Sequence, residues 1–225
     1  MTSILFFGSS HTYYNAAPQI FRIICEEGGH DVDVHMLIKG GYPLEKFADP
    51  TDPYGIKLRE LLQTEHFDII FFQDLAIRPS AMTDVFFQSV RTLGELIAPT
   101  GSRVILYQTC ARKEGHIELE KYGLTPLSMT EKTAAAYQTI ARELNYEVSP
   151  LGTAFYDVYK QRPKFDLHNM DGGHPSAHGS YLAALCHYAT AFGEDPESVT
   201  YKLPQIDEES AKILRRAAHD AIFQK

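Results

Sequence analysis

The chain has 225 residues, of which 44% are hydrophobic and 22% are charged. These proportions are ordinary for a globular protein and leave enough apolar material for one sizeable core. The 21 basic and 29 acidic residues give a formal net charge of −8, which argues against nucleic acid or an anionic membrane as a partner.

Neither a membrane segment nor a targeting segment is evident. No stretch approaches the roughly 20 apolar residues of a membrane helix, and the opening MTSILFF lacks the basic start and cleavage site of a signal peptide. The three cysteines, Cys25, Cys110 and Cys186, are odd in number and widely spaced, which fits neither a disulfide framework nor a zinc knuckle. We therefore expect a cytoplasmic protein.

Short apolar runs alternate with longer segments of helical periodicity along the chain. In chain order the predicted elements are strand 3–8, helix 16–29, strand 31–38, helix 54–65, strand 67–74, helix 83–98, strand 102–109, helix 128–145, strand 146–152, helix 178–193 and helix 207–223. Residues 110–125 are predicted to be irregular. The third strand is apolar on both faces, which is typical of the middle of a parallel sheet.

This alternation, without repeats, low-complexity tracts or linkers, favours a parallel sheet with helices on both faces. We predict one domain over residues 1–225 with a three-layer α/β/α fold. The sheet is expected to have five parallel strands in the flavodoxin-like order 2-1-3-4-5. In such sheets, ligands bind beyond the carboxyl ends of the strands.

Residues that could take part in catalysis or binding follow several of the predicted strands. They occur in GSSHT (8–12), KGGYPL (39–44), QDLAIRPS (73–80) and the loop that opens DGGHPSAHGS (171–180). Together these segments offer a hydroxyl, glycine N–H groups, an amide and an Asp/His pair. Nucleophilic acyl transfer needs these parts: an attacking hydroxyl, a base, a carboxylate that orients the base, and donors for the oxyanion.

Two of the segments resemble sequence blocks of the SGNH (GDSL-like) hydrolases. FFGSSHTYYN (6–15) is similar to their first block in a variant form, and DGGHPSAHGSYLAALCHYATAFG (171–193) is similar to their last, Asp-x-x-His-Pro followed by a helix. The resemblance implies that Ser10 is the nucleophile, that His174 is its general base and that Asp171 orients His174. The implied activity is that of a serine ester hydrolase acting on a small-molecule ester, with an acetylated carbohydrate as the leading substrate and no metal or organic cofactor.

The resemblance also implies an oxyanion hole made by Ser10, Gly41 and Gln73. Two positions depart from the family pattern, because Ser9 stands in place of the first-block Asn and Gln73 in place of the third-block Asn. Gln73 carries the same amide on a longer stem. The residues expected to line the substrate site are His11, Tyr13 and Gly40.

Each of these residues also has a simpler interpretation. Ser10 could cap the following helix, and Asp171 and His174 could be a turn former and a loop histidine. A metal site made by His11, His174, His178 and Asp171 is a further alternative, although its ligands have no recognised spacing.

Two other functions stay open. A flavodoxin-like nucleotide or flavin binder would share the fold class, but GSSHT is neither a dinucleotide-binding fingerprint nor a P-loop. A catalytically weak or inactive SGNH-like carbohydrate-binding domain is the other possibility, since losing one oxyanion donor typically costs about 10²–10³ in rate.

Overall fold

The computed structural model describes residues 1–163 and 165–224. Five strands form one sheet in the order β2-β1-β3-β4-β5, and every neighbouring pair is parallel. The strands are β1 (Thr2–Gly8), β2 (Val32–Ile38), β3 (Ile69–Gln73), β4 (Arg103–Tyr107) and β5 (Glu147–Ser149). The predicted strand order is confirmed, and every predicted strand overlaps an observed one.

Helices connect and follow the strands. They are α1 (Ala17–Glu27), α2 (Leu44–Ala48), α3 (Pro53–Thr64), α4 (Arg78–Ala81), α5 (Thr83–Ile97), α6 (Ile117–Tyr122), α7 (Pro126–Leu144), α8 (Leu151–Gln161), α9 (Ala177–Phe192) and α10 (Glu208–Phe223). The prediction that 110–125 is irregular is wrong for α6. The ring of His116 accepts a hydrogen bond from the N–H of Glu118 at the start of this helix, and Gly123 ends it at φ 62°.

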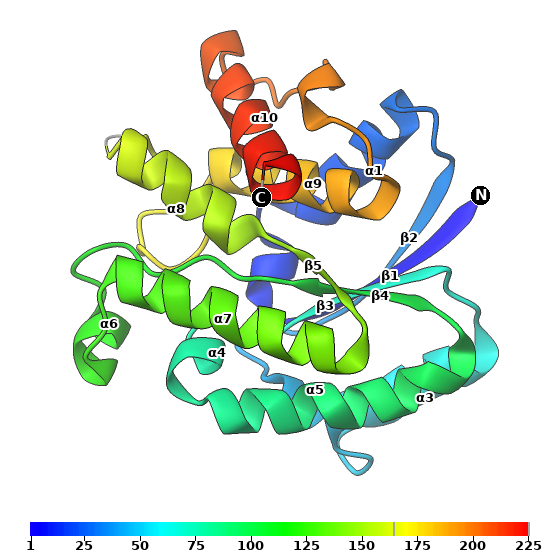
Figure 1. Ribbon diagram of the computed structural model, residues 1–225. Coiled ribbons are helices and arrows are strands. Elements are labelled where there is room, and N and C mark those ends of the chain that lie inside the picture. Colours follow the sequence, from blue (N-terminus) through cyan, green and yellow to red (C-terminus); the bar gives the residue numbers. More distant parts are fainter. Residues whose placement is uncertain (164, 225) are drawn as a thin grey trace.

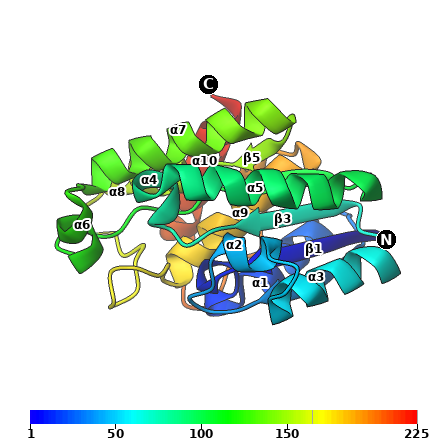
Figure 2. The same ribbon diagram turned by 90° about the horizontal axis from the view of Figure 1, so that it is seen from below.

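Two apolar layers enclose the sheet. In β1, Ile4 and Phe6 belong to one buried cluster, while Leu5 and Phe7 belong to the other. Helices α1, α8, α9 and α10 cover the first face, and α2, α3, α5 and α7 cover the second (Figure 1; α2 is labelled in Figure 2). Seen from below, α3 and α5 run along the strands (Figure 2). The three-layer α/β/α fold is therefore confirmed.

The carboxyl ends of the central strands lie at one level. Gly8 at the end of β1 pairs with Ile38 of β2 and with Gln73 of β3. Gly8 has φ 145°, and a Cβ there would lie 2.6 Å from the carbonyl oxygen of Gln73. A residue with a side chain would not fit this close approach, so glycine allows β1 to lead directly into Ser9 and Ser10. The yellow loop before α9 lies at the same edge (Figure 1).

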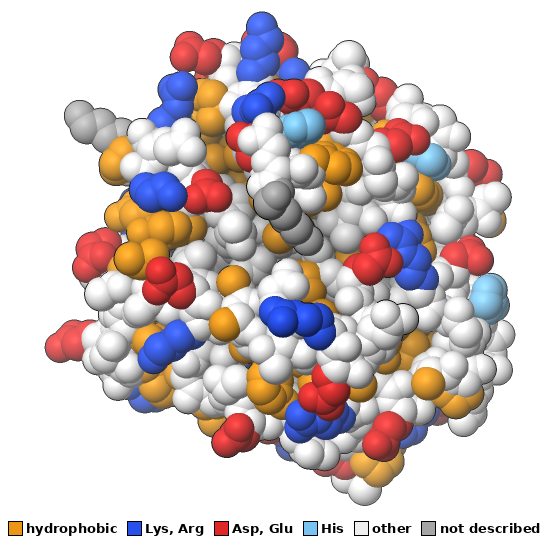
Figure 3. All heavy atoms as spheres, in the orientation of Figure 1, with side chains coloured by type: hydrophobic (Ala, Val, Ile, Leu, Met, Phe, Trp, Pro, Cys, Tyr) orange, Lys and Arg blue, Asp and Glu red, His pale blue; other side chains and the backbone are white. Residues whose placement is uncertain are grey.

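The three cysteines are buried, and the face drawn in Figure 3 carries charges of both signs. Cys25, Cys110 and Cys186 are buried thiols, and burial raises the pKa of each well above its usual value, which makes them unreactive. On the face shown in Figure 3, Lys and Arg side chains lie among Asp and Glu side chains. Within the described residues, no helix combines the length and the hydropathy that crossing a membrane requires.

Candidate active site

The first part of the site is the turn that follows β1. Ser10 begins a short 3₁₀ helix, η1 (Ser10–Thr12), and its Oγ lies 2.7 Å from Nε2 of His174. The N-cap of η1 is Ser9, and no side chain caps the helix. The alternative in which Ser10 is a helix cap is therefore wrong. The hydroxyl of Ser10 instead meets a histidine 164 positions further along the chain.

The second part is the loop from Asp171 to His174. Oδ2 of Asp171 lies 2.6 Å from Nδ1 of His174, and its Oδ1 accepts the N–H groups of Gly173 (2.9 Å) and His174 (3.0 Å). Because a carboxylate can only accept here, Nδ1 of His174 carries the proton and Nε2 is left to accept one from Ser10. Three-residue spacing thus places the carboxylate against the ring nitrogen that faces away from the hydroxyl.

Asp171 keeps its charge in this arrangement. Burial by itself would raise its pKa, but the hydrogen bonds from the backbone and ring of His174 and from the N–H of Gly173 hold it far below its usual range. A carboxylate that stays ionised through the whole physiological pH range can stabilise the imidazolium formed during proton transfer.

A segment after β4 supports this loop. Arg112 donates from Nη1 to the carbonyl of Gly173 (2.7 Å) and from Nε to Glu118 (2.6 Å), while the N–H of Lys113 donates to the carbonyl of Gly172 (2.9 Å). Sequence analysis missed Arg112 because it lies in the stretch predicted to be irregular. The rule that ligands bind at carboxyl strand ends, applied to the fourth strand, points to it.

His11 lies within the site, but its ring is buried and not open to solvent. Nε2 of the ring lies 3.0 Å from the carbonyl of Gly173, and the ring lies edge-on to the His174 ring at 5.3 Å between centroids. Burial, followed by the charges of Arg112 and His174, lowers the pKa of His11 well below its usual value. A neutral His11 therefore contacts the loop that carries the base, and its predicted contact with substrate stays a prediction.

Gly40 and Tyr13 lie beside the nucleophile. A Cβ on Gly40 would be 3.0 Å from the hydroxyl of Tyr13 and 4.0 Å from Cβ of Ser10. Tyr13 is 44% exposed, so its ring is open to a ligand. The structure thus brings these two predicted substrate-lining residues together with Ser10, and no side chain on residue 40 fills the space between them.

The backbone N–H groups of Ser10 and Gly41 have no hydrogen-bond acceptor in the part of the chain that the structure describes. Gly41 has φ 65° in a tight turn closed by a hydrogen bond from Tyr42 N to Lys39 O (3.2 Å). Among the described residues, no hydrogen bond engages the N–H of Gly41. The N–H of Ser10 is the first of η1 and has no acceptor within that helix.

The side-chain amide of Gln73 is already engaged and is not free to donate to an oxyanion. It is fully buried, and its Nε2 donates to Oγ of Ser9 (2.8 Å) and to Oγ1 of Thr12 (3.1 Å). Both amide hydrogens are therefore used beneath the turn that carries Ser10. Donation to an oxyanion would require one of these hydrogen bonds to be released.

We expect Gln73→Ala to lower kcat by about 10- to 100-fold and the free energy of unfolding by about 2–3 kcal/mol. The reason is that the substitution leaves Ser9 and Thr12 without their partner and opens a cavity under the turn. The measurement combines steady-state kinetics with urea unfolding. Gln108→Ala is the matched control, because Gln108 is also buried and bonds a single threonine, Thr153. Gln108→Ala should lose stability and keep the wild-type kcat. If Gln73→Ala instead lost kcat without losing stability, Gln73 would act only as an oxyanion donor.

Asp74, the next residue, is a buried carboxylate that sequence analysis did not single out. Its Oδ1 accepts the N–H groups of Leu44 (3.0 Å) and Leu75 (2.7 Å), while its Oδ2 has no partner among the described residues. Burial raises its pKa to about 6. Since Leu44 begins α2 soon after the Gly40–Gly41 turn, Asp74 ties the end of β3 to this turn.

The raised pKa predicts how Asp74 affects stability. Between about pH 4 and pH 6 the folded protein binds a proton at Asp74 that the unfolded chain does not, so the free energy of unfolding falls as the pH rises through this window. The full effect is at most about 3 kcal/mol. Asp74→Asn should lack this pH-dependent loss. Urea unfolding should therefore show that the stability of the variant relative to wild type increases between about pH 4 and pH 6 and stays constant at higher pH. A difference that does not change with pH would contradict this expectation.

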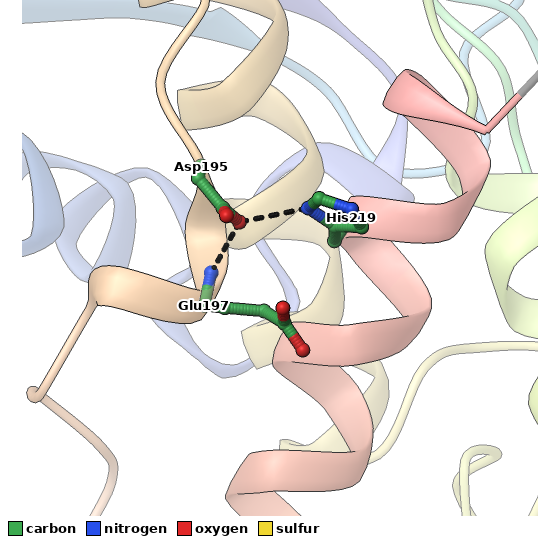
Figure 4. A group of neighbouring side chains, drawn as sticks. All are labelled: Asp195, Glu197 and His219. Atoms are coloured by element: carbon green, nitrogen blue, oxygen red, sulfur yellow. Dashed lines mark hydrogen bonds and ion pairs between the residues drawn. The ribbon is translucent and has the colours of Figure 1, made fainter.

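One other cluster in the described residues has the composition of a metal site. Ligand-type atoms of Asp195, Glu197 and His219 all lie within 4.8 Å of one another (Figure 4). Oδ1 of Asp195 already accepts hydrogen bonds from Glu197 N and His219 Nδ1, both at 2.9 Å, and Arg216 lies 3.4 Å from the Glu197 carboxylate. These contacts explain the cluster as a helix cap with ion pairs. It contains none of the residues of the alternative metal site.

Comparisons with known proteins give matches among solved structures. No protein-family model matches the chain, and no curated protein does. A protein from Slackia heliotrinireducens, described as a candidate SGNH hydrolase, is 25% identical over 84% of this chain and 98% of its own, with a TM-score of 0.76. A DUF4886 family protein from Bacteroides uniformis is 21% identical over 98% of this chain and 94% of its own, with a TM-score of 0.85.

The acetyl xylan esterase AlAXEase is 13% identical over 83% of this chain and 98% of its own, with a TM-score of 0.65. The chain therefore has the fold of the SGNH/GDSL-like hydrolases and esterases.

Proposed function

We propose that the protein is a serine ester hydrolase of the SGNH type. The observation that carries the proposal is the continuous path of hydrogen bonds from the Ser10 hydroxyl through the His174 ring to the Asp171 carboxylate, with distances of 2.7 and 2.6 Å. Both are within the reach that general-base catalysis needs.

The proposed reaction has two halves. As Oγ of Ser10 attacks the ester carbonyl carbon, Nε2 of His174 takes its proton, and the N–H groups of Ser10 and Gly41 stabilise the oxyanion. Collapse breaks the bond to the alkoxy oxygen, which receives the proton from His174 and leaves as an alcohol. Water then attacks the acyl-enzyme while His174 takes a proton from this water. As the bond between the acyl carbon and Oγ of Ser10 breaks, His174 returns the proton to Oγ, and the carboxylic acid is released. The cycle needs neither a metal nor an organic cofactor.

For the substrate we propose a small acyl ester, with an acetylated carbohydrate as the leading choice. The acetyl xylan esterase among the structural neighbours supports this choice at the level of fold. Gly40 supports a compact acyl site next to Ser10, and the exposed ring of Tyr13 offers a surface on which a sugar can stack.

A slow or inactive relative of these enzymes is the second candidate. It is favoured by the engagement of both Gln73 amide hydrogens with Ser9 and Thr12. With only the two backbone donors, the expected rate is about 10²–10³ lower than that of an enzyme with a third donor.

A panel of esters tests the proposed function. p-Nitrophenyl acetate, butyrate and octanoate, together with acetylated xylo-oligosaccharides, are compared by kcat/KM at constant pH. We expect acetyl esters to give the highest values and the octanoate the lowest. A preference for the octanoate would contradict the proposed substrate class, and no hydrolysis of any ester would favour the inactive relative.

A further inference from the structure

The segment between η1 and α1 contains two successive residues in the left-handed region. Asn15 has φ 51° and ψ 30°, and Ala16 has φ 57° and ψ 39°. Asn tolerates this conformation, but the Cβ of Ala makes it unfavourable. Such backbone persists only where surrounding contacts hold it, and it is found most often at functional sites.

Hydrogen bonds tie this turn to the chain that follows His174. Nδ2 of Asn15 donates to the carbonyl of Pro175 and to Oγ of Ser180, both at 2.9 Å. Ser180 is fully buried, and its hydroxyl donates to the carbonyl of Tyr14 (3.1 Å). The turn and the His174 loop are therefore fixed to each other through the Asn15 side chain.

The turn places the ring of Tyr14 on one face of the His174 ring. The two rings are nearly parallel, at 11°, with centroids 4.1 Å apart. Tyr13 stacks in turn on Tyr14, with centroids 5.9 Å apart and an angle of 27°. The base is thus covered on one face by an aromatic residue that the strained turn positions.

The stack restrains a motion that the hydrogen bonds of His174 leave free. Ser10 and Asp171 bond the ring at Nε2 and Nδ1, so neither bond resists tilting of the ring about the line that joins these two atoms. A ring packed against the face does resist it. The electron-rich face of Tyr14 also attracts the imidazolium that forms when His174 takes the proton.

We propose that Tyr14 is a positioning residue for His174, held in place by the Asn15–Ala16 turn. The inference rests on the proposed esterase function and goes beyond it, because Tyr14 acts on the base and on neither Ser10 nor the substrate. Its loss should therefore lower turnover and leave substrate binding unchanged.

The experiment compares wild type with Tyr14→Phe and Tyr14→Leu, by kcat and KM on one acetyl ester and by the rate at which a fluorophosphonate labels the protein. We expect Tyr14→Phe, which keeps the stack, to stay within about threefold of wild type in all three. Tyr14→Leu should lose about 10- to 100-fold in kcat and in labelling rate, because the base is misplaced, with KM nearly unchanged.

A second pair of variants tests the turn. Asn15→Ala removes the two hydrogen bonds and should lower kcat in the same way as Tyr14→Leu. Asn145→Ala is the matched control, because Asn145 has nearly the same backbone conformation, φ 55°, at the end of α7. Asn145 precedes β5 and so lies at the amino ends of the strands, whereas the site lies at their carboxyl ends. The substitution should therefore leave kcat unchanged.

The outcomes separate this inference from the proposed function. A change confined to KM in Tyr14→Leu would make Tyr14 a substrate contact. An unchanged kcat and labelling rate would show that Tyr14 does not position His174. Either result overturns the inference and leaves the esterase proposal intact. An equal loss in Tyr14→Phe would assign the effect to the hydroxyl and overturn the stacking argument. A wild-type protein that neither hydrolyses esters nor takes up the probe overturns the esterase proposal and this inference together.

Discussion

Replacing Ser10 by alanine is expected to lower kcat/KM by about 10⁴- to 10⁶-fold for every ester that the wild-type protein hydrolyses. Removing Oγ removes the attacking atom, and the acyl-enzyme can no longer form. The residual rate would come from the backbone donors and from substrate binding, which the substitution leaves in place. The measurement is kcat/KM on an acetyl ester with protein purified free of host esterases.

Ser9→Ala is the matched control, since Ser9 is the neighbouring serine and lies under the same turn. It loses the two hydrogen bonds that join the Ser9 hydroxyl to the Gln73 amide (2.8 and 3.3 Å) and should cost only about tenfold in kcat. Circular dichroism and thermal unfolding would show that both variants fold. If Ser10→Ala kept the wild-type rate while Ser9→Ala lost activity, the nucleophile would be Ser9 and the proposed proton path would be wrong.

The second large effect is expected at the base. His174→Ala should lower kcat by about 10⁴- to 10⁶-fold, because the Ser10 hydroxyl is a weak nucleophile until a base takes its proton. Asp171→Asn should cost less, up to about 10⁴-fold, because it mis-orients the imidazole and favours the wrong tautomer without removing the base. The pKa of Asp171 lies far below its usual range, so its charge should not limit activity at mildly acidic pH.

His178→Ala serves as the control for the histidine substitutions. The His178 ring packs edge-on against Phe165 at 5.1 Å and belongs to none of the hydrogen bonds of the proposed triad. We expect kcat to stay within about threefold of wild type. A loss at His178 as large as that at His174 would instead revive the alternative metal site. Activity that is lost on chelation and restored by a divalent metal would do the same.

The fold was predictable because the central strands β1, β3 and β4 are runs of mostly apolar, buried residues. Ile70, Phe71 and Phe72 of β3 are buried from both sides of the sheet, and such a run has few alternatives. Helix α8, in contrast, was not among the predicted elements. Its Leu151 and Gly152 follow a strand of only three residues, β5, and the predicted strand absorbed them. Helix α8 itself has 11 residues, and its buried Leu151, Ala154, Phe155 and Val158 recur at helical spacing, so a periodic pattern was present in the sequence.

The strand-end rule predicts that Ser9, Ser10 and the Asp171–His174 pair lie at one edge of the sheet, and the resemblance to the SGNH hydrolases adds the choice of Ser10 as nucleophile and the roles of the pair. The supporting contacts were not predictable. Whether Gln73 points at the substrate or under the turn depends on side-chain directions set by the tertiary fold. The left-handed conformation at Ala16 has no sequence signal at all, since alanine ordinarily avoids it.

The most direct test of the central claim is to locate the covalent adduct of a fluorophosphonate by mass spectrometry. Attack by an activated serine displaces fluoride and leaves one phosphonyl group on Oγ. We expect a single adduct on the intact wild-type protein, located by peptide mapping at Ser10, and none on Ser10→Ala. An adduct at another residue accompanied by loss of activity, or an active protein that takes up no probe, would contradict the account.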